Sequence, residues 1–227
     1  MVSARHARHV WATDITERAA LYCEFNRRLA GLNNMSVLTG DLYAPVEGLT
    51  FDRIMIHPPY VPAQQNQVIF RDGGEDGEQV IRGAVQGLAR FLRPGGHFYA
   101  LVMASDRAGE TFEQRLRKWL GSQENEFDVA TGIYTAHSPA ECFTQSLLQG
   151  GLDSETALFL DRLWRTTATE LILYAAVLIE RHASTRPAQS ARFNLVEQSL
   201  TVHHLESLFD ANLGPTPEGK MGCRGDA

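Results

Sequence analysis

The chain has 227 residues, 44% of them hydrophobic and 21% charged, a composition typical of one folded domain and unlike that of disordered chains. Its formal net charge of -6 excludes a general electrostatic attraction to nucleic acid, so any basic surface must be local. Three widely spaced cysteines, no apolar run of bilayer length and no leader-like start predict a soluble, cytoplasmic protein without a disulfide framework.

The first half of the chain is expected to alternate strands with helices, because short apolar stretches ending at polar residues are followed by apolar positions at helical spacing. In chain order the predicted elements are a strand at residues 9–14, a helix from the cap Thr16 to about Leu29, a strand at 36–39, a loop over 42–50, a strand at 51–56 and a helix at 77–92 that stops at Pro94.

The second half continues the alternation and then changes character. Its predicted elements are a strand at 97–103, an amphipathic helix at 110–120, a strand at 127–134, a helical insertion at about 139–166 and an apolar strand at 169–179 that could also be a buried helix. Residues 1–182 are thus expected to form one α/β domain. Residues 183–227 are expected to form a partly flexible extension with an amphipathic segment at 195–209.

This alternation predicts a Rossmann-like α/β fold with a doubly wound, mostly parallel sheet, because right-handed crossovers place helices on both faces. Ligands of such sheets bind beyond the carboxyl ends of the strands. Three predicted strands end there in polar residues, namely Asp14, Asp41 and the run His57-Pro58-Pro59-Tyr60. Asp14 is a candidate acceptor for two ribose hydroxyls, although Asp14 and Asp41 could equally cap a helix and a turn.

The two consecutive prolines in this run carry further chemistry. They fix φ and remove two N–H donors, which leaves a neighbouring backbone carbonyl free to accept a hydrogen bond from a substrate amine. Tyr60 adds a flat face against which a planar amide or base can stack. The alternative is a rigid surface turn without a ligand.

The ordered features of the first half are Asp14, Gly40–Tyr43, Phe51–Pro62, Gly73–Gly77 and Leu92–Gly96. Together they resemble the class I S-adenosylmethionine-dependent methyltransferases, within them the branch that carries an Asn/Asp-Pro-Pro-Tyr motif. The resemblance runs from about Val10 to Met103. Its order and spacing are most similar to release-factor glutamine methyltransferases and their base-modifying relatives.

The resemblance implies S-adenosylmethionine as cofactor and methyl transfer to nitrogen of a protein side chain, a nucleobase or a small molecule. The implied cofactor-binding residues are Asp14 and Ile15 for the ribose, Asp41 and Leu42 for adenine, and His57. The implied catalytic residues, which would hold the methyl acceptor, are His57, Pro58, Pro59 and Tyr60. Catalysis would then consist largely of aligning an amine lone pair with the methyl group.

Two features depart from the family. His57 stands where the family has Asn or Asp, and an imidazole offers one acceptor nitrogen where a carboxamide offers a donor and an acceptor. The glycine-rich turn that follows the family's first strand has no counterpart before Asp14. The sheet is therefore expected to lack a central strand and to leave buried backbone groups unpaired. Either an upstream segment or another chain, such as a second copy, would supply the missing strand, or the remaining strands would rearrange.

Other residues admit less specific interpretations. Gly73–Gly77 would form either a mobile rim over the substrate pocket or a helix-initiating turn. Asp106 and Glu110 could resemble a catalytic carboxylate pair, but helix capping and exposure to solvent explain them adequately. The eight histidines lack acids or thiols at ligand spacing, so no metal site is expected. Two alternative functions remain, a non-catalytic scaffold with this fold and a nicotinamide dehydrogenase, of which the second leaves the Pro-Pro-Tyr run unexplained.

Overall fold

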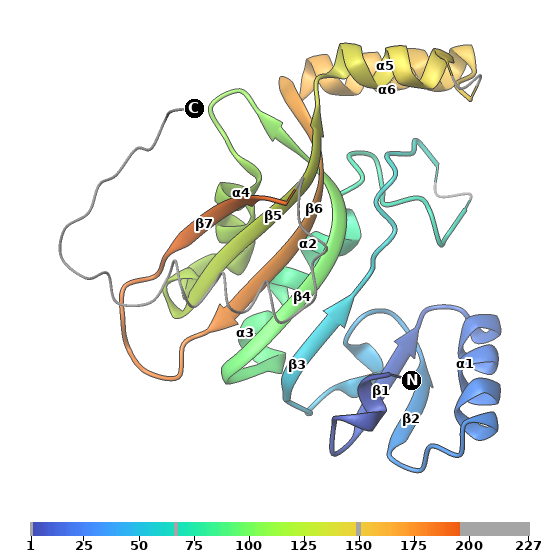
Figure 1. Cartoon of the computed structure of the whole chain (residues 1–227), viewed down its shortest axis with the longest axis vertical. Coiled ribbons are helices and arrows are strands. Elements are labelled where there is room, and N and C mark those ends of the chain that lie inside the picture. The colour runs from blue at the N-terminus through green and yellow to red at the C-terminus, as the bar shows by residue number, and fades with distance from the viewer. Residues whose placement is uncertain (1, 66–67, 149–150, 196–227) are drawn as a thin grey trace, which may run out of the picture.

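The structure is a computed structural model that describes residues 2–65, 68–148 and 151–195. Figure 1 shows a small unit at the amino terminus beside a larger sheet that is backed by helices. The small unit comprises η1 (Ser3–Arg5), β1 (Val10–Asp14), α1 (Glu17–Leu29) and β2 (Met35–Thr39), and η2 (Ala44–Val46) follows it.

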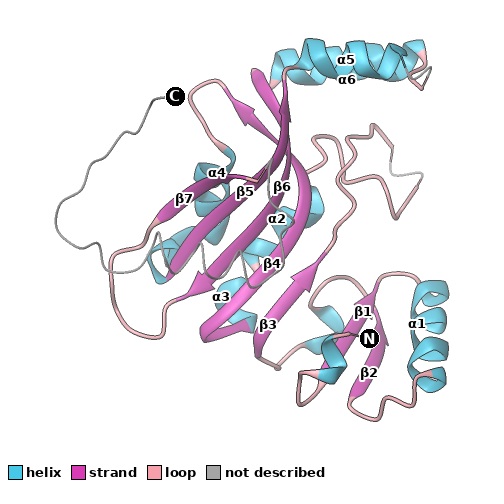
Figure 2. Cartoon of the chain, in the orientation of Figure 1, coloured by secondary structure: helices cyan, strands magenta, loops and turns pink. Residues whose placement is uncertain are grey.

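The larger unit contains the remaining elements. They are β3 (Phe51–Ile56), α2 (Gln79–Gln86), α3 (Leu88–Phe91), β4 (Leu92–Arg107), α4 (Phe112–Leu120), η3 (Gly121–Glu126), β5 (Phe127–His137), α5 (Pro139–Leu148), α6 (Ser154–Thr166), β6 (Thr169–Arg181) and β7 (Ser190–Asn194). Figure 2 shows α5 and α6 projecting from the ends of β5 and β6 as a helical hairpin. Their position agrees with the predicted insertion.

The strands form two sheets, one with β1 and β2 and one with the order β3-β4-β6-β5-β7. The pairs β1–β2, β3–β4 and β5–β7 are parallel, whereas β6 is antiparallel to both of its neighbours. The predicted α/β class and the parallel arrangement of the first four strands are confirmed. From the gap between β1 and β3, the chain passes from β1 to β2 on one side and from β3 to β4 on the other. The direction of winding therefore reverses between β1 and β3.

The sheet is interrupted at this reversal. Among the described residues, no strand lies between β1 and β3, and each of the two pairs on one side only. Trp11 of β1 and Phe51 of β3 meet across the interruption, with ring centroids 5.5 Å apart. The expected loss of a central strand is therefore seen, but the expectation of buried unpaired groups is wrong. Most residues of β1 and β3 are exposed or half-buried, so these groups lie near water.

The core lies on one face of the larger sheet, beneath α2, α3 and α4. Alternate residues of the strands point into it, as the two-residue period of a strand requires. Phe98, Val102, Val129 and Val177 are among its fully enclosed side chains. The apolar run at 169–179 is thus a buried strand and not a helix.

Three predicted elements differ from the structure. The single helix expected at 77–92 is divided into α2 and α3 at Gly87, where the Tyr43 ring occupies the space that a side chain would need. The strand expected at 97–103 begins at Leu92, although Pro94 was expected only to end a helix. The predicted extension contains β7, which pairs with β5. The amphipathic segment expected at 195–209 falls outside the described residues after Leu195.

Candidate functional site

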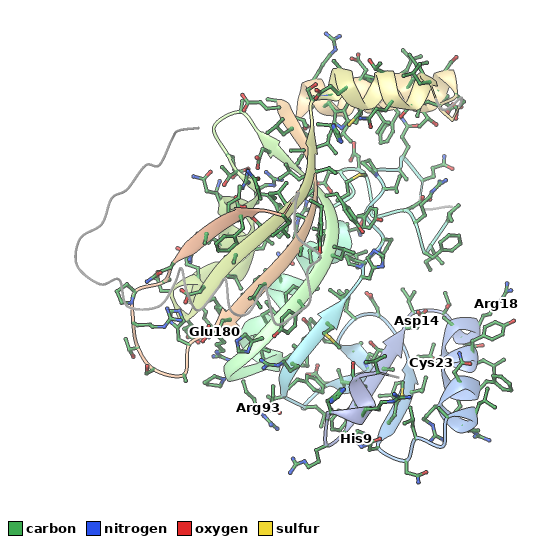
Figure 3. The ribbon with its side chains drawn as sticks, viewed as in Figure 1. His9, Asp14, Arg18, Cys23, Arg93 and Glu180 are labelled. Carbon is green, nitrogen blue, oxygen red and sulfur yellow. The ribbon has the colours of Figure 1, made fainter. Side chains whose placement is uncertain are left out.

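The predicted site residues follow the carboxyl ends of β1, β2 and β3. Asp14 is the last residue of β1 and pairs with Thr39, the last residue of β2, so Asp14 and the following Gly40-Asp41 lie at the same edge. Figure 3 shows Asp14 at this end of β1 and His9 at the opposite end. Since β1 and β3 run in the same sense in Figure 1, His57 emerges on the same edge.

The Asp14 carboxylate has one oxygen engaged locally and one oxygen available. Oδ1 accepts hydrogen bonds from the backbone N–H and the hydroxyl of Thr16, both at 2.8 Å. Thr16 in turn accepts a bond from Ala19 N–H and caps α1. Oδ2 has no partner within the described ranges, and Asp14 is exposed. The capping role is therefore real, and it leaves an acceptor atom for a ligand.

The residues after β2 lie in an unusual backbone conformation. Asp41 is exposed and its carboxylate has no partner in the described part of the chain. Leu42 adopts a φ of 41°, a left-handed conformation that is uncommon for a leucine and that recurs at ligand-binding positions. Its backbone carbonyl accepts a bond from the Thr13 hydroxyl at 3.3 Å, and its side chain packs against the main core. Ile15, the other predicted cofactor residue, is half exposed at 52%.

Tyr43 anchors this segment to the larger unit. Its hydroxyl donates a 2.7 Å hydrogen bond to the carbonyl of Ala84, and its ring stacks on Phe91 with centroids 4.3 Å apart. Burial raises the pKa of the Tyr43 hydroxyl far above its usual value, so the group is a permanent donor. The turn that carries Asp41 and Leu42 is therefore held against α2 and α3.

The His57-Pro58-Pro59-Tyr60 run follows β3. Its His57 is exposed and its Pro58 is buried. The rings of His57 and Tyr60 lie 5.7 Å apart, so the structure brings these two predicted residues together. Within the described ranges no hydrogen bond or ring contact joins them to Asp14 or Asp41, and the site they would share is a prediction.

Gly73 and Gly77 pack closely against the backbone of this run. A Cβ atom at Gly73 would lie 2.7 Å from the carbonyl oxygen of Pro59 and 2.8 Å from Cα of Tyr60, and one at Gly77 would meet the carbonyl oxygen of Tyr60. Only glycine permits this close approach. Both glycines are buried, and the segment leads into α2 through Glu78, its N-cap residue. The interpretation as a helix-initiating turn fits this packing.

A buried ion pair lies directly behind these glycines and was missed by sequence reasoning. Glu78 accepts two hydrogen bonds from the Arg115 guanidinium, at 3.1 and 2.7 Å, and Arg107 approaches the same carboxylate at 3.2 Å. The Glu78 and Arg115 side chains are only 1% and 5% exposed. Such a pair holds its geometry because either charge alone would be costly to bury. It fixes the start of α2 to α4.

Two further tyrosines that the sequence did not single out extend the aromatic contacts of Tyr60. The ring of Tyr174 in β6 lies 6.3 Å from that of Tyr60, and the ring of Tyr134 in β5 lies 5.7 Å from that of Tyr174. Neither is near Tyr60 in the sequence, so only the pairing of β6 with β4 and β5 brings them together.

An open hollow of about 530 Å³ lies elsewhere, at the base of the α5–α6 hairpin. Phe143 and Trp164 form part of its wall, and no predicted site residue lines it. Within the described ranges, no group of three or more metal-ligating side chains occurs. No helix in the same ranges is both long and apolar enough to cross a bilayer.

Comparison with known proteins identifies several relatives. The chain is 34% identical over 128 residues to a release factor glutamine methyltransferase of Moorella thermoacetica. The aligned residues make up 52% of this chain and 44% of that protein. It is 29% identical over 110 residues to a putative protein N5-glutamine methyltransferase of Methanocaldococcus jannaschii, covering 46% and 54%. It is 29% identical over 131 residues to a ribosomal protein uL3 glutamine methyltransferase of Bradyrhizobium diazoefficiens, covering 52% and 41%.

The chain thus spans about half the length of the curated relatives that it matches. No protein-family model matches it. A solved rRNA methylase of Streptococcus thermophilus aligns with a TM-score of 0.37 and 13% identity over 77% of this chain and 76% of that one.

Proposed function

Because the chain is related in sequence to protein glutamine methyltransferases, we propose that it transfers a methyl group from S-adenosylmethionine to an amide nitrogen of a protein side chain. One structural observation supports the proposal most directly. Asp14 ends β1, and Asp41 and His57 follow β2 and β3, all at the carboxyl ends of strands beside the point where the winding reverses. Ligands of open α/β sheets bind beyond the strand ends at this position.

The residues of the small unit fit an adenosyl group. The free Oδ2 of Asp14 is an acceptor for a ribose hydroxyl, because an ionised carboxylate accepts and never donates. The unpartnered carboxylate of Asp41 is an acceptor for the exocyclic amine of adenine. The left-handed backbone at Leu42 follows it, and Ile15 offers exposed apolar surface beside Asp14. When bound, S-adenosylmethionine supplies an electrophilic methyl group.

The run after β3 would hold the acceptor. Pro58 and Pro59 lack N–H groups, so the backbone carbonyls around them remain available to an amide N–H of the substrate. The Tyr60 ring provides a face for the planar amide. The amide nitrogen forms its new bond to the methyl carbon as the sulfur–carbon bond breaks, and the pair of electrons stays with sulfur. The exposed His57 imidazole, in its neutral form, can take the proton that the nitrogen then loses.

A protein acceptor is favoured over a nucleobase or a small molecule, since the relatives are named for release factors and a ribosomal protein. Release factors and ribosomal proteins act in translation, which supports a cytoplasmic location for the proposed reaction. The His57 side chain, which stands where the family has Asn or Asp, would make the acceptor site differ in detail from those of the relatives.

The proposal is tested by calorimetric titration of the chain with S-adenosylhomocysteine and by methyl transfer from labelled S-adenosylmethionine to a glutamine-containing peptide. Asp14→Asn keeps the oxygen that receives the Thr16 bonds but removes the charge and the second anionic acceptor, so it should weaken binding at least about tenfold. Asp161→Asn, on the distant helix α6, is the matched control and should bind like the unaltered chain.

The interruption between β1 and β3 favours a second candidate, a non-catalytic scaffold. A chain that folds cooperatively but binds neither S-adenosylmethionine nor S-adenosylhomocysteine would support that function and overturn the enzymatic one. Binding at micromolar concentration with equal affinity in the Asp14→Asn variant would keep cofactor binding but remove Asp14 from the site.

A further inference from the structure

The Tyr60 ring does not stand alone at the end of β3. It lies 6.3 Å from the Tyr174 ring, edge to face, and Tyr174 lies 5.7 Å from Tyr134. With His57, which lies 5.7 Å from Tyr60, these rings form a continuous row, here called the tyrosine row. The row begins on the predicted acceptor run after β3 and ends on β5, three strands away in the sheet.

Strand register places the tyrosine row beyond the end of β3. The last residue of β3, Ile56, pairs with Ala100, but β4 continues to Arg107. Tyr174 pairs with Met103 on this protruding part of β4. It therefore lies level with the chain that leaves β3, in the region where a substrate of the strand-end site would be.

The row also occupies one defined face. Leu173 and Ala175, the neighbours of Tyr174, are buried in the main core, so Tyr174 points to the opposite face, away from α2, α3 and α4. Tyr134 reaches the row through a β-bulge, because the pairing passes from Ile133–Ala175 directly to Thr135–Tyr174 and leaves Tyr134 unpaired. Bulges of this kind redirect a side chain and are common beside active sites.

The three hydroxyl groups of the row are available for bonding. Within the described ranges none of them has a hydrogen-bond partner, although all three side chains are half-buried. In the part of the chain that the structure describes, none of the three hydroxyl oxygens is enclosed in the protein without a partner, so a ligand can reach them. Burial raises the pKa of the Tyr174 hydroxyl, and the neighbouring Tyr60 and Tyr134 hydroxyls raise it further, so Tyr174 keeps its proton and can donate a hydrogen bond to an acceptor atom.

We propose that Tyr134 and Tyr174 bind the methyl-accepting side chain together with Tyr60, and that the acceptor is an uncharged amide whose plane lies on the rings and whose carbonyl oxygen receives a tyrosine hydroxyl. This inference rests on the proposed methyl transfer and names two residues beyond those of the predicted motif. The edge-to-face arrangement of Tyr60 and Tyr174 leaves ring surface that suits a flat amide. A hydroxyl donor complements the amide oxygen, whereas a hydrocarbon side chain would leave it unpaired.

The first test uses fluorine NMR of the chain labelled with 3-fluorotyrosine, with resonances assigned by single Tyr→Phe substitutions. The probe is an acetylated and amidated pentapeptide with a central glutamine and four alanines, and the same peptide with a central leucine is the control. The glutamine peptide should shift the resonances of Tyr60, Tyr134 and Tyr174 and leave that of Tyr22, which lies on the exposed side of α1, unchanged. This measurement does not require turnover.

The second test measures methyl transfer to the same peptide. Tyr134→Phe and Tyr174→Phe keep the ring and remove the hydroxyl, so each should raise the KM for the peptide about three- to tenfold with kcat changed less than about twofold. Binding of S-adenosylhomocysteine should be unaltered in both variants. Tyr22→Phe is the matched control with no expected effect. A tyrosine that only packed would leave the KM unaltered when replaced by phenylalanine.

The two measurements separate this inference from the proposed function. Transfer with a shift at Tyr60 alone would uphold the methyltransferase and overturn the role of Tyr134 and Tyr174. Shifts at all three tyrosines without transfer would uphold the amide-binding surface and overturn the methyltransferase. If the experiments show no shifts and no transfer, both proposals are overturned. Equal shifts with the glutamine and the leucine peptides would overturn the specificity for an amide.

Discussion

The small amino-terminal unit and the larger sheet are stabilised in different ways. In the small unit, Ala20 of α1 and Met35 of β2 are buried, whereas Leu21, Phe25 and Leu29 are at least 62% exposed. Its structure depends on local groups, such as the Thr16 cap and the ion pairs of Glu24 with Arg27 and Arg28. The larger sheet instead buries a continuous apolar core on one face.

The difference matters because the proposed site uses both units. The predicted cofactor residues Asp14 and Asp41 follow strands of the small unit, and the acceptor residues follow β3 of the larger one. A weakly packed unit opens locally at a lower free energy than a core sheet does. Ligand binding across both would therefore stabilise the small unit most, since a ligand stabilises whatever state it binds.

Removing core volume from the larger sheet should have the largest effect on stability. Phe98→Ala empties a fully buried position in β4 and should lower the free energy of unfolding by about 3–5 kcal/mol. Met35→Ala, in the small unit, should cost less, because fewer buried groups surround that side chain. Denaturant unfolding of both variants measures the difference. Equal losses would show that the two units share one core.

The buried pair behind the acceptor run should have the next largest effect. Arg115→Met leaves the Glu78 carboxylate buried without its main partner, so the free energy of unfolding should fall by about 3 kcal/mol. The double variant Glu78→Gln with Arg115→Met should recover part of this loss, because no buried charge then remains unpaired. A double variant less stable than Arg115→Met would contradict this interpretation.

Acid should loosen β7 from the larger sheet. Arg192 of β7 binds Asp106 at 2.6 Å and Glu113 at 2.6 Å. Burial is the largest influence on both carboxyls and alone would raise their pKa values. Hydrogen bonds and charge from Arg192, together with the Phe112 N–H on Asp106 and the Thr131 hydroxyl on Glu113, outweigh it and hold both pKa values below their usual range. Carboxyls with depressed pKa values in the folded state stabilise it above about pH 4, and this stabilisation is lost as the pH falls through the folded values.

Hydrogen exchange of the β7 amides between about pH 5 and pH 3, corrected for intrinsic rates, measures this loosening. The protection of β7 should fall more than that of β4. Arg192→Met should remove most of the acid-induced loss of protection, since it removes the main group that lowers both pKa values against the effect of burial. A pH dependence that survives this substitution would place its origin elsewhere.

Local sequence patterns predicted the elements whose cause is local. The strand Phe51–Ile56 was predicted to the residue, because it is bounded by a loop and by two prolines. The helix after Thr16 was also predicted, because a side-chain cap is a property of four consecutive residues. The Pro-Pro-Tyr run was found for the same reason.

Features that depend on distant segments were not predictable. The Tyr43 ring leaves no room for a side chain at Gly87, where α2 gives way to α3, and no pattern around residue 87 reveals that ring. Tyr134 and Tyr174 approach Tyr60 only through strand pairing and a bulge, whose position depends on the partner strand. The Glu78–Arg115 pair joins residues 37 positions apart. Single-sequence reasoning has no access to such contacts.

The helix cap provides a smaller test of the small unit. Thr16→Ala removes the acceptor of the Ala19 N–H and the hydroxyl that binds Asp14, and should cost about 1 kcal/mol. Because the lesion is local, hydrogen exchange should accelerate in α1 and remain unaltered in β4. Thr156→Ala, within the first turn of α6, is a control that leaves the α1 cap intact. Uniform acceleration across both units would show that they unfold together.

The smallest expected effect concerns the outer face of α1. Phe25 is 62% exposed there, near Leu21 and Leu29, and Phe25→Ser should change the free energy of unfolding by less than about 0.5 kcal/mol. The substitution should also raise solubility, because these exposed apolar side chains form a surface that favours association. Unfolding curves and sedimentation at several concentrations measure both effects. A loss above about 1 kcal/mol that grows with protein concentration would mean that this face is covered in an oligomer, since only association makes stability depend on concentration.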